Sequence, residues 1–140
     1  MSLDPDSFQS LAGFRLALRR FLAASEGISR AAGITQQQYQ ALLAVKAGPG
    51  EMTIGDLAGQ LLLTHHAAVQ LVDRMAHAGL AERAPSRTDR RSVHVRLTAA
   101  GDALVSQLAE AHAHEALRQE PQLTRSLRRL RRSLDKQAGG

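Results

Sequence analysis

The sequence predicts a mainly α-helical fold in which a small β-hairpin interrupts the helices. Two observations lead to this prediction. Apolar residues recur at steps of three and four over most of the 140 residues, which is the spacing of one helix face. Between Ala81 and Leu97 the spacing changes to two, which is typical of a half-buried strand. A chain of this length fits one domain of ordinary size.

Composition narrows the classes of function. The chain is 44% hydrophobic but only 3% aromatic, so it predicts an aliphatic core without a wide aromatic cofactor pocket. A net charge of +5 favours an anionic partner. The absence of cysteine excludes disulfides, zinc fingers and thiol chemistry. No apolar run approaches the roughly 20 residues that span a bilayer, and no signal peptide is evident, so we expect a cytoplasmic protein with no membrane partner.

The first two helices are predicted from their apolar spacing and from a cap. An apolar face runs from Phe8 to Ile28. Thr35 precedes Gln38 by three residues, which is the pattern of a capping box, and we expect a second helix to begin there. That helix should end at the Gly-Pro-Gly of residues 48–50, because glycine and proline both terminate helices.

Two short helices follow, joined by a tight turn. Thr53 with Asp56 three residues on predicts the start of the first, which runs to Leu61. Thr64 predicts the N-cap of the second, and Gly79 suits the left-handed position that ends it. Two such helices followed by a basic hairpin predict a winged helix-turn-helix over about residues 53–98.

The hairpin and the C-terminal helices complete the expected elements. Residues 85–89 are turn formers, and the alternating stretch from Val93 to Leu97 predicts a strand paired with residues 80–84. Thr98 should cap a helix that runs to Ala111. Pro121 suits the first turn of a separate last helix. The expected total is about six helices plus a β-hairpin wing.

The second helix of the pair presents a polar outer side. His66, Gln70 and Arg74 lie at i, i+4 and i+8, and a helix in the major groove reads bases mainly with its N-terminal residues. Glutamine pairs with an adenine edge and a small alanine meets a thymine methyl, whereas an arginine farther along suits phosphate. The candidate DNA contacts on this helix are Thr64, His65, His66, Ala67, Gln70 and Arg74.

The hairpin tip concentrates positive charge. Arg87, Arg90 and Arg91 are candidate wing contacts, since arginine is favoured in narrow minor grooves. Asp89 lies among them and would repel phosphate if it faced DNA. We therefore expect Asp89 to turn inward and brace a neighbouring arginine, with Arg91 the best candidate.

The stretch Leu71-Val72-Asp73-Arg74-Met75, then Gly79-Leu80, Asp89-Arg90-Arg91, Val95-Arg96-Leu97-Thr98 and Gly101 resembles the MarR family of bacterial regulators. The Asp-x-Arg followed by Leu-Thr-x-x-Gly is the most specific part, and the resemblance covers nearly the whole chain. It implies a single domain over residues 1–140. Dimerisation helices would span about residues 5–32 and 99–137, and the winged helix-turn-helix about residues 34–98.

The resemblance also implies roles. The recognition helix would be Thr64 to Ala78, and Arg91 would enter the minor groove. The terminal helices would interleave with those of a second copy, so that a homodimer binds a palindromic operator on double-stranded DNA. The expected function is that of a dimeric transcriptional regulator, most simply a repressor, whose operator affinity a small-molecule effector changes. The family's cysteine-based sensing is absent, because the chain has no cysteine.

Other interpretations stay open beside this one. A winged helix can serve as a protein-interaction surface, or bind DNA without sequence preference. Phe14, Phe21 and Tyr39 suit core or dimer packing better than an effector pocket. The C-terminal arginines, from Arg125 to Arg132, are expected to form a solvated helix face.

Catalysis, a metal and a cofactor are not expected. No Gly-rich phosphate loop follows a strand, and no serine has a placed base and acid. The adjacent His65 and His66 diverge by about 100° on a helix, so they serve one ion poorly.

Overall fold

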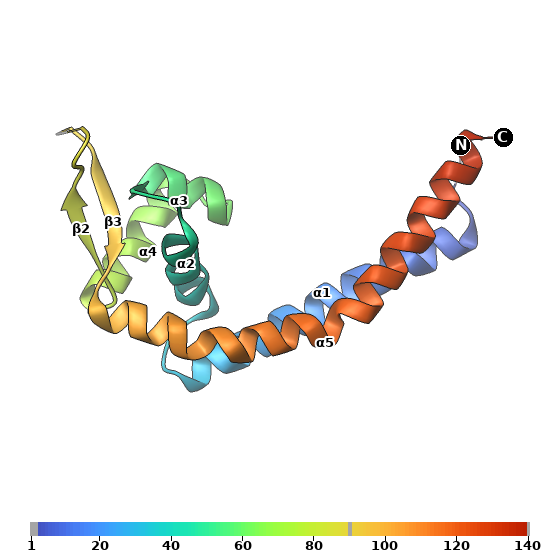
Figure 1. Ribbon diagram of the computed structural model, residues 1–140, viewed down its shortest axis with the longest axis horizontal. Coiled ribbons are helices and arrows are strands. Elements are labelled where there is room, and N and C mark those ends of the chain that lie inside the picture. Colours follow the sequence, from blue (N-terminus) through green and yellow to red (C-terminus); the bar gives the residue numbers. More distant parts are fainter. Residues whose placement is uncertain (1–2, 90, 140) are drawn as a thin grey trace. The chain divides into compact units, whose positions relative to one another are not determined.

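The computed structural model describes residues 3–89 and 91–139, which form five helices and three strands. The chain divides into two compact units. We call residues 29–109 the central unit and residues 3–28 with 110–139 the terminal unit. The elements in chain order are α1 (Pro5–Ala31), α2 (Gln36–Ala47), β1 (Met52–Thr53), α3 (Ile54–Leu61), α4 (His65–His77), β2 (Ala81–Pro85), β3 (Val93–Leu97) and α5 (Ala99–Ala138) (Figure 1).

The central unit contains a three-stranded antiparallel sheet in the order β1-β3-β2. The predicted hairpin is confirmed as β2 and β3, with Arg83 opposite Val95 and Pro85 opposite Val93. The two-residue β1 was not predicted, because Met52 and Thr53 are too few to show a period. Met52 pairs with Val95, and this pairing joins the hairpin to the start of α3.

Local capping sets the helix starts as the sequence predicted. The hydroxyl of Thr35 accepts a hydrogen bond from the N–H of Gln38, whose side chain accepts from the N–H of Thr35. Thr53 and Asp56 form the same reciprocal pair at α3. Each box satisfies two backbone donors that a helix start otherwise leaves free.

One hydrophobic core holds the central unit together. Leu42 of α2, Leu57 of α3 and Leu71 of α4 are each at most 1% exposed. They pack with Val95 of β3 and Val105 of α5, which are also fully buried. Tyr39, considered above for a pocket, belongs to this core at 4% exposure.

The end of α4 and the start of α5 meet at a close backbone crossing. Gly79 adopts φ 75°, and the N–H of Leu80 donates to the carbonyl of Met75, which is the Schellman ending of a helix. The hydroxyl of Thr98 donates to the carbonyl of Gly79 at 2.6 Å and accepts from the N–H of Gly101. A Cβ on Gly101 would lie 1.9 Å from the carbonyl oxygen of Leu80, so only glycine fits there.

The expected break at Pro121 is wrong. α5 continues without interruption from Ala99 to Ala138, with Pro121 inside it. A proline in a helix removes one backbone hydrogen bond and crowds the preceding turn. On both sides of that point α5 is attached to α1, by a hydrogen bond between His112 and Ser25 and by one from the hydroxyl of Ser133 to Asp4.

Small polar residues face α5 from α1 within the terminal unit. Ser7, Ser10 and Ser25 are buried, and Ala17 is fully buried. The large apolar residues that predicted the helix are instead partly exposed. On α1 the exposed large apolar side chains are Phe8, Leu11, Leu16, Leu18 and Leu22, and on the terminal part of α5 they are Leu117, Leu127 and Leu134.

Candidate nucleic-acid interface

Helix α4 has one buried and one exposed face. Its start is fixed by Thr64, whose hydroxyl accepts a hydrogen bond from the N–H of Ala67 at 3.1 Å. Leu71, Val72 and Met75 are at most 1% exposed and anchor the helix in the core. The opposite face is therefore fixed in direction by packing, which is what a reading surface needs.

All the predicted recognition-helix residues lie on or beside that outer side. His66, Gln70 and Arg74 are exposed and, at four-residue steps, span an arc of about 80°. Thr64 and His65 are exposed at the N-terminal end, and Ala67 is half-buried. The structure thus brings donors, acceptors and a cation together on one helix face.

The turn between α3 and α4 is tight and contains a non-glycine residue with a left-handed backbone. Leu62 ends α3 in the left-handed region, at φ 55° and ψ 42°, and is 92% exposed. The N–H of Leu63 then donates to the carbonyl of Ala58 at 2.9 Å. Ala58 is buried where α3 meets α4, so a small side chain permits the close crossing.

Two of the arginines on the hairpin are engaged in ion pairs. Arg83 contacts Asp73 of α4 at 2.6 Å, and Arg96 contacts Glu82, its opposite residue on β2, at 2.5 Å. Arg83 thus links the hairpin to α4, whereas Arg96 and Glu82 form an exposed cross-strand pair of a kind that contributes at most about 1 kcal/mol.

The remaining wing arginines are at the tip. Arg87 and Arg91 are exposed, and no side-chain partner is found for either guanidinium within residues 3–89 and 91–139. Arg90, the third predicted wing contact, lies outside the described residues. Two exposed cations at the tip therefore remain available to an anion.

Asp89 turns toward the wing backbone. Its Oδ1 accepts from the N–H of Arg91 at 3.0 Å and its Oδ2 from the hydroxyl of Ser92 at 3.0 Å. The hydrogen bond from the N–H of Arg91, and then that from Ser92, lower the pKa of Asp89 below its usual range. The contact with Arg91 is through its backbone and not its guanidinium, so this carboxylate shapes the turn and leaves the arginine side chain free.

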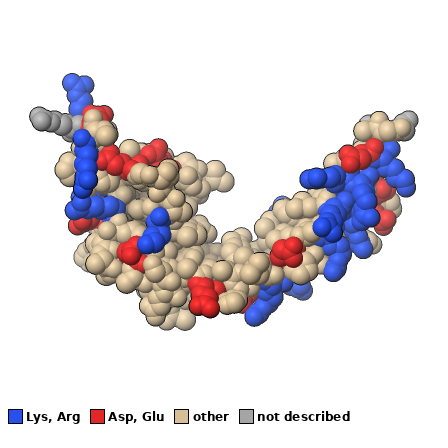
Figure 2. Space-filling model, viewed as in Figure 1, with Lys and Arg blue, Asp and Glu red and all other residues tan. Residues whose placement is uncertain are grey.

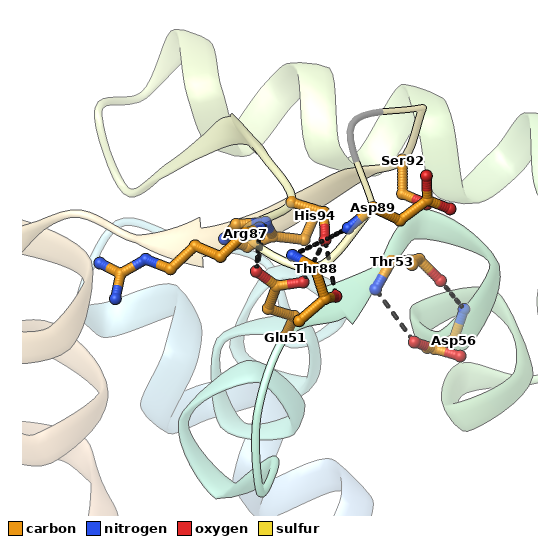
Figure 3. Close-up of polar contacts among 9 residues, drawn as sticks. Glu51, Thr53, Asp56, Arg87, Thr88, Asp89, Ser92 and His94 are labelled. Carbon is orange, nitrogen blue, oxygen red and sulfur yellow. Dashed lines mark hydrogen bonds and ion pairs between the residues drawn. The ribbon is translucent and has the colours of Figure 1, made fainter.

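Sequence reasoning missed Glu51. Its carboxylate accepts a hydrogen bond from the hydroxyl of Ser86. It also accepts one from the N–H of Arg87, as Figure 3 shows. These partners are 35 and 36 residues away in the chain. No periodicity or motif signals such a contact, since it depends on how the sheet brings the hairpin over the loop before α3.

A second concentration of positive charge lies on the C-terminal part of α5 (Figure 2). Its exposed members are Arg125, Arg128, Arg129, Arg131, Arg132 and Lys136. They belong to the terminal unit, whereas the wing belongs to the central unit. Their role as a solvated helix face stays a prediction.

The described residues offer neither a metal site nor a membrane-spanning helix. Across residues 3–89 and 91–139, no three His, Asp or Glu side chains come together in a way that could hold a metal ion. Within that part of the chain, no helix has the length and apolar character needed to cross a membrane.

The geometry agrees with comparisons to known proteins. Residues 32–92, which contain α2, α3, α4, β2 and the hairpin tip, match the model of the MarR family. Over these residues the chain is similar to the MarR family. A 59-residue stretch is 36% identical to the uncharacterized HTH-type transcriptional regulator YsmB of Bacillus subtilis (strain 168), covering 42% of this chain and 40% of YsmB.

Solved structures share the fold over a longer range. AbsC, a MarR family transcriptional regulator from Streptomyces coelicolor, superposes with a TM-score of 0.76 at 22% identity, over 99% of this chain and 96% of AbsC. A point mutant of MarR from E. coli, complexed with operator DNA, superposes with a TM-score of 0.62 at 23% identity, over 73% of this chain and 75% of that one. The predicted winged helix fold is therefore confirmed.

Proposed function

We propose that this protein is a homodimeric transcriptional regulator that binds a palindromic operator in double-stranded DNA. The observation that supports it most is the outer face of α4, which is exposed, polar and fixed in direction by a buried opposite face. Arg87 and Arg91 at the wing tip supply exposed positive charge in the same unit. The MarR mutant from E. coli, which shares the fold, forms a complex with operator DNA.

Each contact has its own role in this proposal. Gln70 reads a base edge in the major groove, Arg74 contacts phosphate, and Arg91 enters the minor groove. Arg91→Ala then weakens operator binding by roughly 1–3 kcal/mol. Arg96→Ala is the matched control. It removes the same positive charge, but from a side chain that is already paired with Glu82. Equal losses in the two variants, measured by fluorescence anisotropy, would contradict the wing assignment.

Base reading and phosphate contact are separated by a second pair of variants. Gln70→Ala should relax sequence preference at one position, whereas Arg74→Ala should weaken all duplexes alike. Affinity should fall steeply with added salt, since phosphate contacts release counterions. A complex whose affinity does not change with salt concentration would indicate a protein partner instead.

Dimerisation is supported by the apolar surface of the terminal unit. Phe8 is 60% exposed, Leu117 67% and Leu134 54%, and a second copy that covered them would remove their apolar surface from water. A second copy that covers them would place two recognition helices on half-sites about one helical turn apart, ~10 base pairs. Analytical ultracentrifugation at micromolar concentration tests this. A monomer at that concentration would contradict the proposal that a dimer binds a palindromic operator.

The dimer acts by occupying a promoter, which makes it a repressor in this proposal. In this proposal the dimer has two arrangements, which differ in the distance between the two recognition helices. A small-molecule effector changes the operator affinity only if it binds one arrangement more tightly than the other. Family resemblance supports this part. Its test is to find a compound that raises Tm and to ask whether the same compound changes the operator Kd. Compounds that raise Tm and leave Kd unchanged would contradict effector control.

A further inference from the structure

Glu51 joins the wing to the loop that precedes α3. Its Oε2 accepts a hydrogen bond from the hydroxyl of Ser86 at 2.5 Å, and its Oε1 accepts from the N–H of Arg87 at 2.7 Å (Figure 3). Both partners lie at the base of the hairpin tip, directly after β2 ends at Pro85. One carboxylate therefore holds two successive residues of the wing.

Ser86 in turn forms hydrogen bonds with the rest of the hairpin tip. Its hydroxyl oxygen accepts from the N–H groups of Thr88 and Asp89, each at 3.1 Å. Its own N–H donates to the carbonyl of Ser92 at 3.1 Å, which closes the turn. The same Asp89 accepts from the N–H of Arg91. A continuous set of hydrogen bonds thus runs from Glu51 to the backbone of Arg91.

We propose that Glu51 is a positioning residue for DNA binding, which fixes the wing so that Arg87 and Arg91 are ordered before DNA arrives. This inference rests on the proposed function of the same surface. Ordering a flexible loop and its long side chains at the moment of binding lowers affinity, so an already ordered wing binds more tightly. The residue touches no DNA itself and acts through Ser86 and Arg87.

The charge of Glu51 makes the inference unusually easy to test. The N–H of Arg87, followed by the hydroxyl of Ser86, holds the pKa of Glu51 below its ordinary value, so the group is ionised at neutral pH. A negative charge beside a phosphate-binding surface opposes DNA. Removing it should strengthen binding if charge alone mattered, whereas loss of positioning should weaken binding.

The experiment compares Glu51→Gln with Glu82→Gln in the full chain. Glu82 is also an exposed-surface carboxylate of the hairpin, and it pairs with Arg96, so both variants lose one negative charge. With an operator duplex obtained by selection, we expect Glu51→Gln to raise Kd about three- to tenfold. Glu51→Ala, which loses both acceptors, should raise it further. Glu82→Gln should leave Kd unchanged or lower it. Equal or tighter binding by Glu51→Gln would overturn the inference.

A second readout does not need DNA. Glu51→Gln should accelerate hydrogen exchange at the N–H of Arg87, followed by NMR, whereas Glu82→Gln should not. Unchanged exchange at Arg87 would show that Glu51 does not order the wing, and would overturn the inference. If the wild-type chain prefers no duplex, the proposed function fails and the DNA part of this inference fails with it. The exchange result then still decides whether Glu51 orders the wing.

Discussion

Replacing Gly101 with alanine should destabilise the protein through a single backbone contact. Gly101 lies in the first turn of α5, where the helix crosses the chain just after α4. An added Cβ would meet the carbonyl oxygen of Leu80 at 1.9 Å and its carbonyl carbon at 2.9 Å. Both atoms belong to the backbone, so no side-chain rotation relieves the clash and the crossing itself must open.

The loss in free energy of unfolding can be worked out from the steric clash and from the hydrogen bonds made at the crossing. Overpacking of a well-packed site costs about 1–3 kcal/mol. Opening the crossing also strains two hydrogen bonds of Thr98, from its hydroxyl to Gly79 and from its N–H to Leu80, each contributing about 1 kcal/mol. Alanine recovers about 1 kcal/mol over glycine in a helix. The expected net loss in free energy of unfolding is about 2–4 kcal/mol.

Gly59→Ala is the matched control. Gly59 lies in α3, and a Cβ added there meets no atom within 4 Å, so the same change should stabilise by up to about 1 kcal/mol. Both variants are compared with the wild type by urea unfolding at one fixed protomer concentration, since dimerisation would make stability concentration-dependent. If Gly101→Ala stays within about 0.5 kcal/mol of the wild type, the account of the α4–α5 crossing is refuted.

Two further predictions concern the turn before α4 and the wing. Leu62→Gly should raise the free energy of unfolding by up to about 1 kcal/mol, because Leu62 has a left-handed backbone and buries almost nothing. Leu62→Ala keeps the strain and should not raise it, so equal gains in urea unfolding would contradict this reasoning. The pKa values of Glu51 and Asp89 lie below their ordinary values of 4.5 and 3.8. The two carboxylates therefore stabilise the wing fully when the pH is above the ordinary values, and this stabilisation is lost as the pH falls through the lowered pKa values. The change in the amide NMR shifts of Arg87 and Arg91 that is linked to these carboxylates should therefore have midpoints below 4.5 for Glu51 and below 3.8 for Asp89, and midpoints at or above those values would contradict the assignment.

The charged groups around Glu51 bear on that titration. His94 Nδ1 lies 3.8 Å from Glu51 Oε1, and its protonation would favour the carboxylate further. The other charged groups that line the hollow beside Glu51 are Lys46, Arg87, Arg96 and Asp102. Lys46 and Asp102 pair with each other at 2.6 Å, and Arg96 pairs with Glu82, so these charges are engaged with partners other than Glu51.

The sequence predicted the central unit well because local chemistry defines it. Thr35, Thr53 and Thr64 each satisfy backbone donors within three residues, and Gly79 takes the one backbone conformation that favours glycine. The period of two in β3 follows from a strand with one buried face, on which Val95 is 2% exposed. Signals of this kind need no knowledge of distant parts of the chain.

Features that depend on distant contacts were missed. Pro121 locally favours a helix start, but α5 continues through it and contacts α1 on both sides of it. The apolar period of α1 predicted a helix but not which side of it is buried. Serines and Ala17 face α5, whereas Phe8 stays exposed. The link from Glu51 to the wing depends on residues 35 positions away, which no local pattern encodes.

The most direct test of the central claim is the affinity of the wild-type protein for a selected duplex compared with random duplex. Selection from random DNA would supply the duplex, and anisotropy titrations at physiological salt would give both Kd values. Specific regulators prefer their sites by about 10³ or more. A homodimeric sequence-specific regulator should select a sequence with two-fold symmetry and prefer it to random duplex by at least about that factor. A ratio near one would contradict sequence-specific regulation and leave a DNA binder without sequence preference.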